Sequence, residues 1–233
     1  MTTKHTNKGD MVRVGFADFQ NEALSLAQKE DENMLETYKQ AFDAAQYENQ
    51  LPSSPSKESY GFGSYDNQVL HRADKPDGFN VHMTEFGSYM HELFEVAIKQ
   101  SIANYYTAKS KLDDDAVIEL NDIEDAYAET LFKRFLTIID FNANYLTEKV
   151  VKGYYLNILF EGSADLIEIH SDNSFTVIDY KNYSKLTEQD IQAHLTQCRI
   201  YAVAFAQQSG MEIREIKVHY PMQDMLETET YGG

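Results

Sequence analysis

Apolar residues that recur at helical spacing predict the main helices in the first half of the chain. Residues 84–109 carry apolar side chains three or four positions apart, as on the buried face of an amphipathic helix: Phe86, Met90, Leu93, Phe94, Ala97 and Ile98. A second, acidic helix is expected over residues 114–139, with a break near Asn121. Helix formers over residues 17–47 predict one or two further amphipathic helices.

The second half of the chain changes to strand-like patterns. Residues 154–160 and 164–170 predict two strands joined by a turn at residues 161–163, and residues 175–181 predict a third strand. A helix over residues 187–208 follows, with Gly210 as its end signal, and a last strand over residues 215–220 stops at Pro221. This order predicts an α/β fold, with a central mixed sheet flanked by helices.

A loop rich in Ser, Pro and Gly over residues 50–66 separates the early helices from the rest. We therefore expect two parts: residues 1–77 with a tail, a helical segment and this loop, and residues 78–233 as the core domain. Hydrophobic residues at 42% and charged residues at 25% are ordinary globular values. No apolar run approaches the ~20 residues that span a bilayer, so no membrane segment is expected. The first ten residues are polar, so no signal peptide is expected and we predict a cytoplasmic location.

Two carboxylates and a lysine form the candidate chemistry. Asp179 and Lys181 are two apart in a predicted strand and therefore project to one side, and an antiparallel hairpin brings Asp165 close to Asp179. Two close carboxylates favour a hard divalent cation such as Mg²⁺ or Mn²⁺, and a neighbouring ammonium can act on a water molecule or on phosphate charge. Taken alone, an acidic residue two before a Lys is common on exposed strands; Glu215 and Lys217 repeat it.

The ordered set of motifs is more specific than this pair. Gly162-x-x-Asp165, Ile178-Asp179-Tyr180-Lys181 and Gln197-x-x-x-Tyr201 resemble the nuclease domains of RecB and AddAB, a branch of the PD-(D/E)XK nuclease superfamily. An upstream Gly87-x-x-x-His91 is similar to a helix of that branch, and the resemblance covers residues 86–222. It implies a restriction-endonuclease-like fold, with residues 78–233 as the nuclease core and an N-terminal helical extension.

The resemblance also implies the role of each matching residue. The metal ligands would be His91, Asp165, Asp179 and the carbonyl of Tyr180. Glu148 matches loosely an acidic position that some relatives have before the Gly-x-x-Asp strand.

Lys181 would be the catalytic lysine of this set. Gln197 and Tyr201, one helical turn apart, would line the site and contact the DNA. Three other histidines, His82, His170 and His194, have no partner in these motifs and are expected to be structural.

The implied function is a Mg²⁺- or Mn²⁺-dependent DNA nuclease, an exonuclease acting on DNA ends or single strands with a metal-activated water. The single Cys198 excludes an iron–sulfur cluster held by several thiolates of this chain. The sequence contains no phosphate-binding Gly-x-x-x-x-Gly-Lys-Ser/Thr motif, so no bound nucleotide is expected. Roles in DNA repair or recombination follow from the same resemblance.

The net charge of −18 opposes tight, unassisted binding to long duplex DNA, because affinity for DNA comes largely from neutralised phosphates. The acidic residues concentrate at 28–36, 112–129 and 223–229, and bound metal ions supply positive charge of their own. Three alternatives stay open: a nuclease subunit that depends on a helicase or recombination partner, a non-catalytic binding module, and an acidic DNA mimic.

Overall fold

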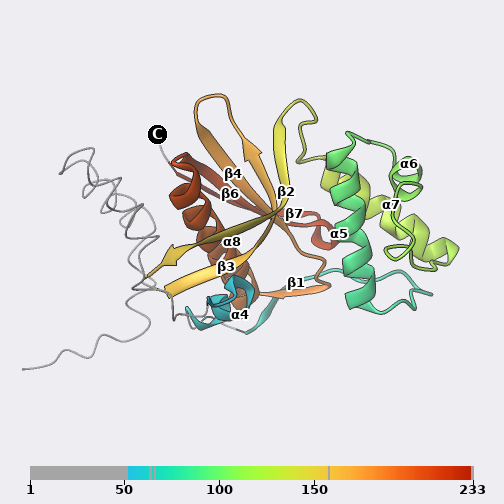
Figure 1. The fold of residues 1–233 in the computed structure, drawn as a ribbon. Helices are drawn as coiled ribbons and strands as arrows, with labels where there is room; N and C mark the ends of the chain where they lie inside the picture. Colours follow the sequence, from blue (N-terminus) through green and yellow to red (C-terminus); the bar gives the residue numbers. More distant parts are fainter. Residues whose placement is uncertain (1–51, 63–64, 66, 157, 232–233) are drawn as a thin grey trace, which may run out of the picture.

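The structure is a computed structural model that describes residues 52–62, 65, 67–156 and 158–231. The helices expected over residues 17–47 lie outside the described residues. Figure 1 shows a central twisted sheet with a long helix on one side and a group of further helices on the other. The expected layers, a mixed sheet flanked by helices, are therefore confirmed.

Five strands form the sheet in the order β2–β3–β4–β6–β7. They are β2 (Asn144–Tyr155), β3 (Ile158–Ile169), β4 (Ser174–Tyr180), β6 (Glu212–Tyr220) and β7 (Met225–Thr230). β4 and β6 are parallel, because α8 crosses between them, and all the other neighbours are antiparallel. The expected third and last strands are confirmed, and β7 was not predicted.

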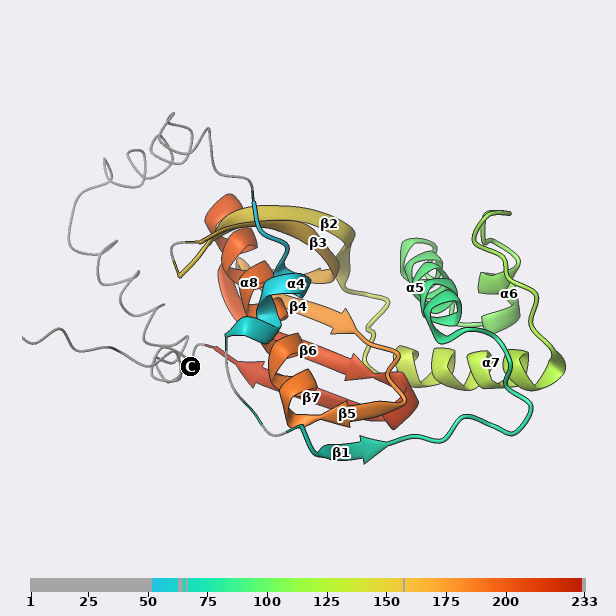
Figure 2. The ribbon, with the colours of Figure 1, turned by 90° about the horizontal axis from the view of Figure 1, so that it is seen from below.

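Helix α8 (Glu188–Ser209) covers one face of the sheet, as Figure 2 shows. Thr187 and Asp190 form a capping box at its start, and Gly210 ends it with a φ of 70° that an L-residue adopts only under strain. Apolar side chains of α8 pack on Phe175 and Val177 of β4 in a buried core. The local capping signals explain why this helix was predicted nearly to the residue.

The opposite face of the sheet packs on α5 (Met83–Lys99) and α7 (Asp122–Leu136), with α6 (Tyr105–Lys109) outside α5. The single helix expected over residues 84–109 is wrong, since the chain forms two. After Lys99 the backbone N–H of Ile102 turns back to the carbonyl of Ala97, and the side chain of Asn104 caps the new helix.

The hairpin of β2 and β3 is longer than expected, and the turn predicted at residues 161–163 is wrong. The chain reverses near Leu156, which has a φ of 49°, and Gly162 pairs with Val151 inside the sheet. A glycine is needed at position 162 because Pro55 and Tyr201 pack closely against its backbone. A Cβ there would lie 3.0 Å from Pro55 Cδ and 3.1 Å from Tyr201 Cε1.

The loop expected over residues 50–66 contains α4 (Pro55–Glu58) and the 3₁₀ helix η1 (Ser59–Gly61). Both contact α8, and Ser53 extends the sheet by bonding the backbone of β3: Ser53 N–H donates to Leu159 O at 2.9 Å. This segment lies upstream of the expected boundary at residue 78.

Two smaller elements complete the described chain. β1 (Val69–Arg72) pairs with β5 (Lys185–Thr187) in a two-stranded ribbon, and η2 (Pro221–Gln223) links β6 to β7.

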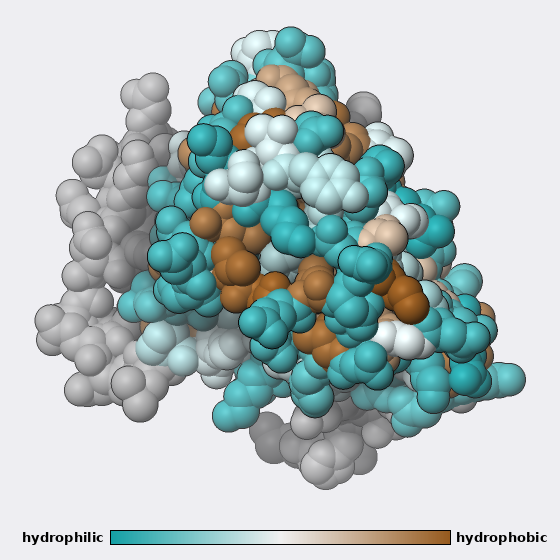
Figure 3. Space-filling model, turned by 90° about the vertical axis from the view of Figure 1, so that its right-hand side faces the viewer, coloured by the Kyte–Doolittle hydropathy of each residue, from teal (hydrophilic) through white to brown (hydrophobic). Residues whose placement is uncertain are grey.

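The helices α5, α6 and α7, here called the helical lobe, turn a mostly hydrophilic surface outward. Figure 3 views the molecule from this side, with hydrophobic residues gathered near the middle of a hydrophilic surround. Among the exposed apolar side chains of the lobe are Tyr106, Val117 and Ile123. The acidic run 112–129 belongs to this lobe. In the described part of the chain no helix is long and apolar enough to cross a membrane.

Candidate metal centre

Asp165 and Asp179 lie on neighbouring strands at the same level of the sheet. Leu166 pairs with Ile178, so the two aspartates occupy the next position of the antiparallel β3–β4 register. The backbone N–H of Tyr180 donates to Asp165 Oδ2 at 3.1 Å, which holds this carboxylate at the end of β4. The expectation that a hairpin brings the two aspartates together is confirmed.

Asp179 is fully buried and pairs with Lys181. The Nζ atom of Lys181 lies 3.1 Å from Oδ1 and 3.0 Å from Oδ2 of Asp179. Burial lowers the pKa of Lys181, but the charges of Asp179 and Asp165 outweigh this effect and leave the pKa raised. The lysine is therefore a cation at neutral pH, fixed beside two carboxylates.

His91, Glu148 and Asp165 form a cluster suited to a metal ion. One ligand atom from each lies within 4.8 Å of those of the other two, and His91 Nδ1 is 3.9 Å from Asp165 Oδ2. His91 comes from the middle of α5, so three elements contribute one donor each. Asp179 is not part of this group; its carboxylate faces Lys181 instead.

Glu148 has a strained backbone in the middle of β2. Its neighbours Thr147 and Lys149 pair with Leu166 and Ala164, which places Glu148 directly across from Asp165. Its φ of 44° is rare outside glycine, and such strain concentrates at functional sites. The hydroxyl of Ser163 donates to Glu148 Oε2 at 3.0 Å and orients the carboxylate.

The charges of this cluster are poorly balanced by the chain itself. Burial, and then the charge of Asp179, raise the pKa of Asp165 well above its usual value. Partial loss of solvent raises the pKa of Glu148, and Glu95 and Glu92 add to the effect. Burial and the charge of Lys181 lower the pKa of His91 to about 4, so its imidazole is neutral near pH 7. Two oxygen donors that repel one another and a neutral ring nitrogen fit a hard divalent cation.

Tyr180 contacts this centre through both its ring and its backbone. The ring packs on His91, with centroids 4.5 Å apart, and on Phe94 of α5. A hydrogen bond to the backbone of Tyr180 acts on His91 and opposes the fall of its pKa. The backbone of Tyr180 therefore lies against one of the three clustered residues.

Gln197 and Tyr201 are bonded to each other on α8. The Nε2 atom of Gln197 donates to the Tyr201 hydroxyl at 2.9 Å, and each residue is only 5% exposed. The Tyr201 ring lies against Gly162, which explains why these two motif positions occur together. Burial raises the pKa of Tyr201, with a further contribution from Asp179, so this pair is electrostatically close to the centre.

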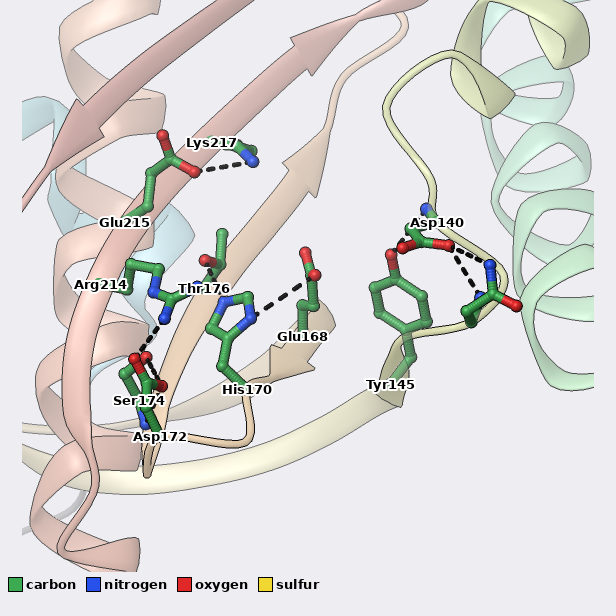
Figure 4. A network of polar contacts seen from close by, with 11 residues as sticks. Asp140, Tyr145, Glu168, His170, Asp172, Ser174, Thr176, Arg214, Glu215 and Lys217 are labelled. Carbon is green, nitrogen blue, oxygen red and sulfur yellow. Dashed lines mark hydrogen bonds and ion pairs between the residues drawn. The ribbon is translucent and has the colours of Figure 1, made fainter.

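The repeated pattern at Glu215 and Lys217 lies elsewhere. Lys217 Nζ is 2.7 Å from Glu215 Oε2 on β6, in a polar network of the sheet that Figure 4 shows. His170 belongs to the same network, through Thr176 Oγ1 at 2.9 Å and Glu168. In the part of the chain that the structure describes, neither Glu215 nor Lys217 joins the metal-ligand cluster.

A comparison with curated proteins gives no match to this sequence. The family model described as the PD-(D/E)XK nuclease superfamily matches residues 44–225, most of the chain. The five-stranded mixed sheet flanked by helices is consistent with the restriction-endonuclease-like fold, and members of this superfamily are nucleases that use divalent metals. The chain belongs to the PD-(D/E)XK nuclease superfamily.

Proposed function

We propose that this protein is a Mg²⁺- or Mn²⁺-dependent DNA nuclease that hydrolyses phosphodiester bonds. The observation that carries the proposal is the convergence of His91, Glu148 and Asp165 beside the ion pair of Asp179 and Lys181. A structural role alone needs neither the strained Glu148 nor a half-buried lysine next to two aspartates.

In this proposal the clustered donors of His91, Glu148 and Asp165 hold the cation. The other predicted ligands, Asp179 and the carbonyl of Tyr180, lie outside that cluster, and we propose that they join it when the cation binds. A bound divalent cation offsets the negative charge that develops on the phosphate and makes a water molecule more acidic. The neutral imidazole of His91 offers a lone pair without adding charge. The hydrogen bonds from Ser163 to Glu148 and from Tyr180 to Asp165 fix the carboxylates.

Lys181 acts as a fixed positive charge. Because Asp179 and Asp165 keep its pKa raised, the ammonium stabilises charge on the phosphate rather than accepting a proton. Asp179 accepts a hydrogen bond from this ammonium at Oδ1, so it also positions the lysine, and its Oδ2 has no hydrogen-bond partner among the described residues. We propose that Gln197 and Tyr201 line the site from the α8 side and contact the DNA strand.

We further propose an exonuclease of the RecB and AddAB type, acting on DNA ends or single strands. The order of the four motifs from Gly87 to Tyr201 supports this assignment. Digestion of 5′- or 3′-labelled single-stranded and duplex DNA, linear and circular, tests it. Cleavage of closed circular DNA at the same rate as linear DNA would contradict exonuclease action.

The nuclease itself is tested by paired lysine variants. Lys181→Met should lower the rate of DNA digestion with Mg²⁺ or Mn²⁺ by about 10²–10⁴-fold, the usual effect of losing one transition-state contact. Lys217→Met is the matched control, because Lys217 sits in the same pattern on β6 outside the cluster. Equal activity of the Lys181 variant and the parent would remove the catalytic assignment.

A second candidate is a nuclease subunit whose helicase or recombination partner supplies the grip on DNA. The net charge of −18 favours it, because long-range repulsion opposes binding to duplex DNA. Copurification and size measurements separate the two. Efficient digestion of duplex DNA by the isolated monomer would argue against the partner.

A further inference from the structure

Two exposed tyrosines from distant parts of the chain meet beside the candidate centre. Tyr60 of η1 and Tyr183, which follows β4, are 37% and 39% exposed. Both rings contact the buried His194 of α8, with centroids 6.2 and 4.9 Å away, and both stand edge-on to it. Both rings are partly exposed, so each offers a face to a ligand in solution.

The two rings are held in place by polar contacts behind them. The hydroxyl of Tyr60 donates to Asp190 Oδ1 at 3.0 Å and lies 3.5 Å from His194 Nε2. His194 Nδ1 is 3.0 Å from the Tyr220 hydroxyl. Behind Tyr183, the side chain of Gln223 donates to its carbonyl at 2.9 Å. A rigid aromatic surface binds a ligand with little loss of conformational entropy.

This surface is continuous with the candidate centre. Tyr183 is two residues after Lys181, and the charges of Lys181 and Asp179 act on His194 between the rings. The tyrosines are therefore close, in the chain and electrostatically, to the ion pair of the centre.

Positive charges border the tyrosines, although the chain as a whole is acidic. Lys57 of α4 lies three residues before Tyr60, and Lys185 of β5 lies two residues after Tyr183. Arg72 of β1 is directly opposite Lys185 in the ribbon, and like charges so placed repel. All three residues are exposed. Among the described residues only Arg72 has a carboxylate partner, with its Nε 3.4 Å from Asp74 Oδ1. The neighbouring charges of Arg72 and Lys185 suit a polyanion.

We propose that Tyr60 and Tyr183 form a stacking platform for unpaired bases, with Arg72 and Lys185 contacting the phosphates of the same DNA strand. Bases of single-stranded DNA expose both faces to aromatic rings, whereas bases of a duplex are already stacked on one another. The platform therefore selects a single-stranded end and leads it toward Lys181. This inference rests on the proposed nuclease function and adds the strand form of its substrate.

Binding of fluorescent DNA tests the platform separately from cleavage. The full chain carrying Lys181→Met is titrated with Mg²⁺ present, using a labelled single strand and a blunt duplex of the same sequence. Adding Tyr183→Ala or Tyr60→Ala should weaken binding of the single strand by about 5- to 100-fold, the range found for base–aromatic stacking. Binding of the duplex should change less than twofold.

Matched variants exclude a simple loss of folding. Tyr183→Phe keeps the ring and should retain single-strand binding, and Tyr106→Ala removes an exposed tyrosine of the distant α6. Unfolding midpoints of all variants are compared. Unchanged single-strand binding in both alanine variants, equal losses on both DNAs, or an equal loss in Tyr183→Phe would overturn the platform. A parent protein that stacks single strands but cuts no DNA would overturn only the proposed nuclease function.

Discussion

Asp165 accepts a hydrogen bond from the backbone N–H of Tyr180, 3.1 Å away, across the β3–β4 pair. The same oxygen lies 3.9 Å from Nδ1 of His91 on α5. One carboxylate thus links the end of β4 to the helix on the other side of the centre. The position of the centre therefore depends on the strand register and on the packing of α5 together, and variants can separate folding from metal binding.

Replacing Glu148 should weaken metal binding while leaving the metal-free protein at least as stable. Its φ of 44° suits glycine, and its carboxylate is repelled by Glu95, Glu92 and Asp179. Glu148→Gly should therefore raise the free energy of unfolding of the metal-free protein by up to about 1 kcal/mol. The same variant should lower Mn²⁺ affinity by about 10- to 100-fold, as measured by calorimetry.

Glu161→Gln is the control for this variant. Glu161 is an exposed carboxylate of β3 that pairs with Lys152 at 3.0 Å, outside the metal-ligand cluster. It should bind Mn²⁺ like the parent. Parent-like Mn²⁺ affinity in Glu148→Gly would exclude Glu148 as a ligand.

Gly153 should tolerate no side chain, because β2 touches α8 there. A Cβ at Gly153 would lie 2.7 Å from Ala204 Cα and 2.6 Å from Gln207 Oε1. Gly153→Ala should lower the free energy of unfolding by about 1–3 kcal/mol through overpacking. At Gly87 in α5 the same added atom would have no atom of the described residues within 4 Å, so Gly87→Ala should stabilise the helix by up to about 1 kcal/mol. Urea unfolding compares the two; equal effects would contradict this packing.

His219 should make the protein less stable in acid. Burial lowers its pKa to about 4, against 6.5 for the free side chain, and its Nδ1 atom is buried without a hydrogen-bond partner in the described part of the chain. Between pH 6.5 and 4 the unfolded state binds a proton that the folded state does not, so stability falls as the pH falls through this range. At about 1.4 kcal/mol for each pH unit, the loss reaches roughly 3 kcal/mol.

The variant His219→Phe removes this proton and the unpaired nitrogen. Its free energy of unfolding, measured in urea at pH 7 and pH 4, should therefore fall less than that of the parent. An identical pH dependence in parent and variant would show that His219 does not contribute to acid sensitivity.

The sequence predicted best those elements whose signals are local. Thr187, Asp190 and Gly210 bound α8 through their own capping bonds, and the two-residue spacing of Asp179 and Lys181 agrees with their ion pair at the end of β4. Gly162 was misread as a turn residue, because its small size is required by Tyr201 and Pro55, which are distant in the chain.

Other features depend on contacts that no local pattern contains. Glu148 matched its motif only loosely in the sequence. Its place beside Asp165 follows from the β2–β3 register, which the sequence around Glu148 does not contain. The pairing of Tyr60 with Tyr183 through the buried His194 joins segments before α5 and after β4. Register and long-range packing decide these positions.

The most direct test of the account is a crystal soaked in Mn²⁺ and measured at a wavelength where manganese scatters anomalously. We predict one anomalous peak within about 2.5 Å of donor atoms of His91, Glu148 and Asp165, the bonding range for hard cations and their ligands. A peak at another site, or none at saturating Mn²⁺ in a crystal that places these three residues apart, would contradict the proposed metal centre.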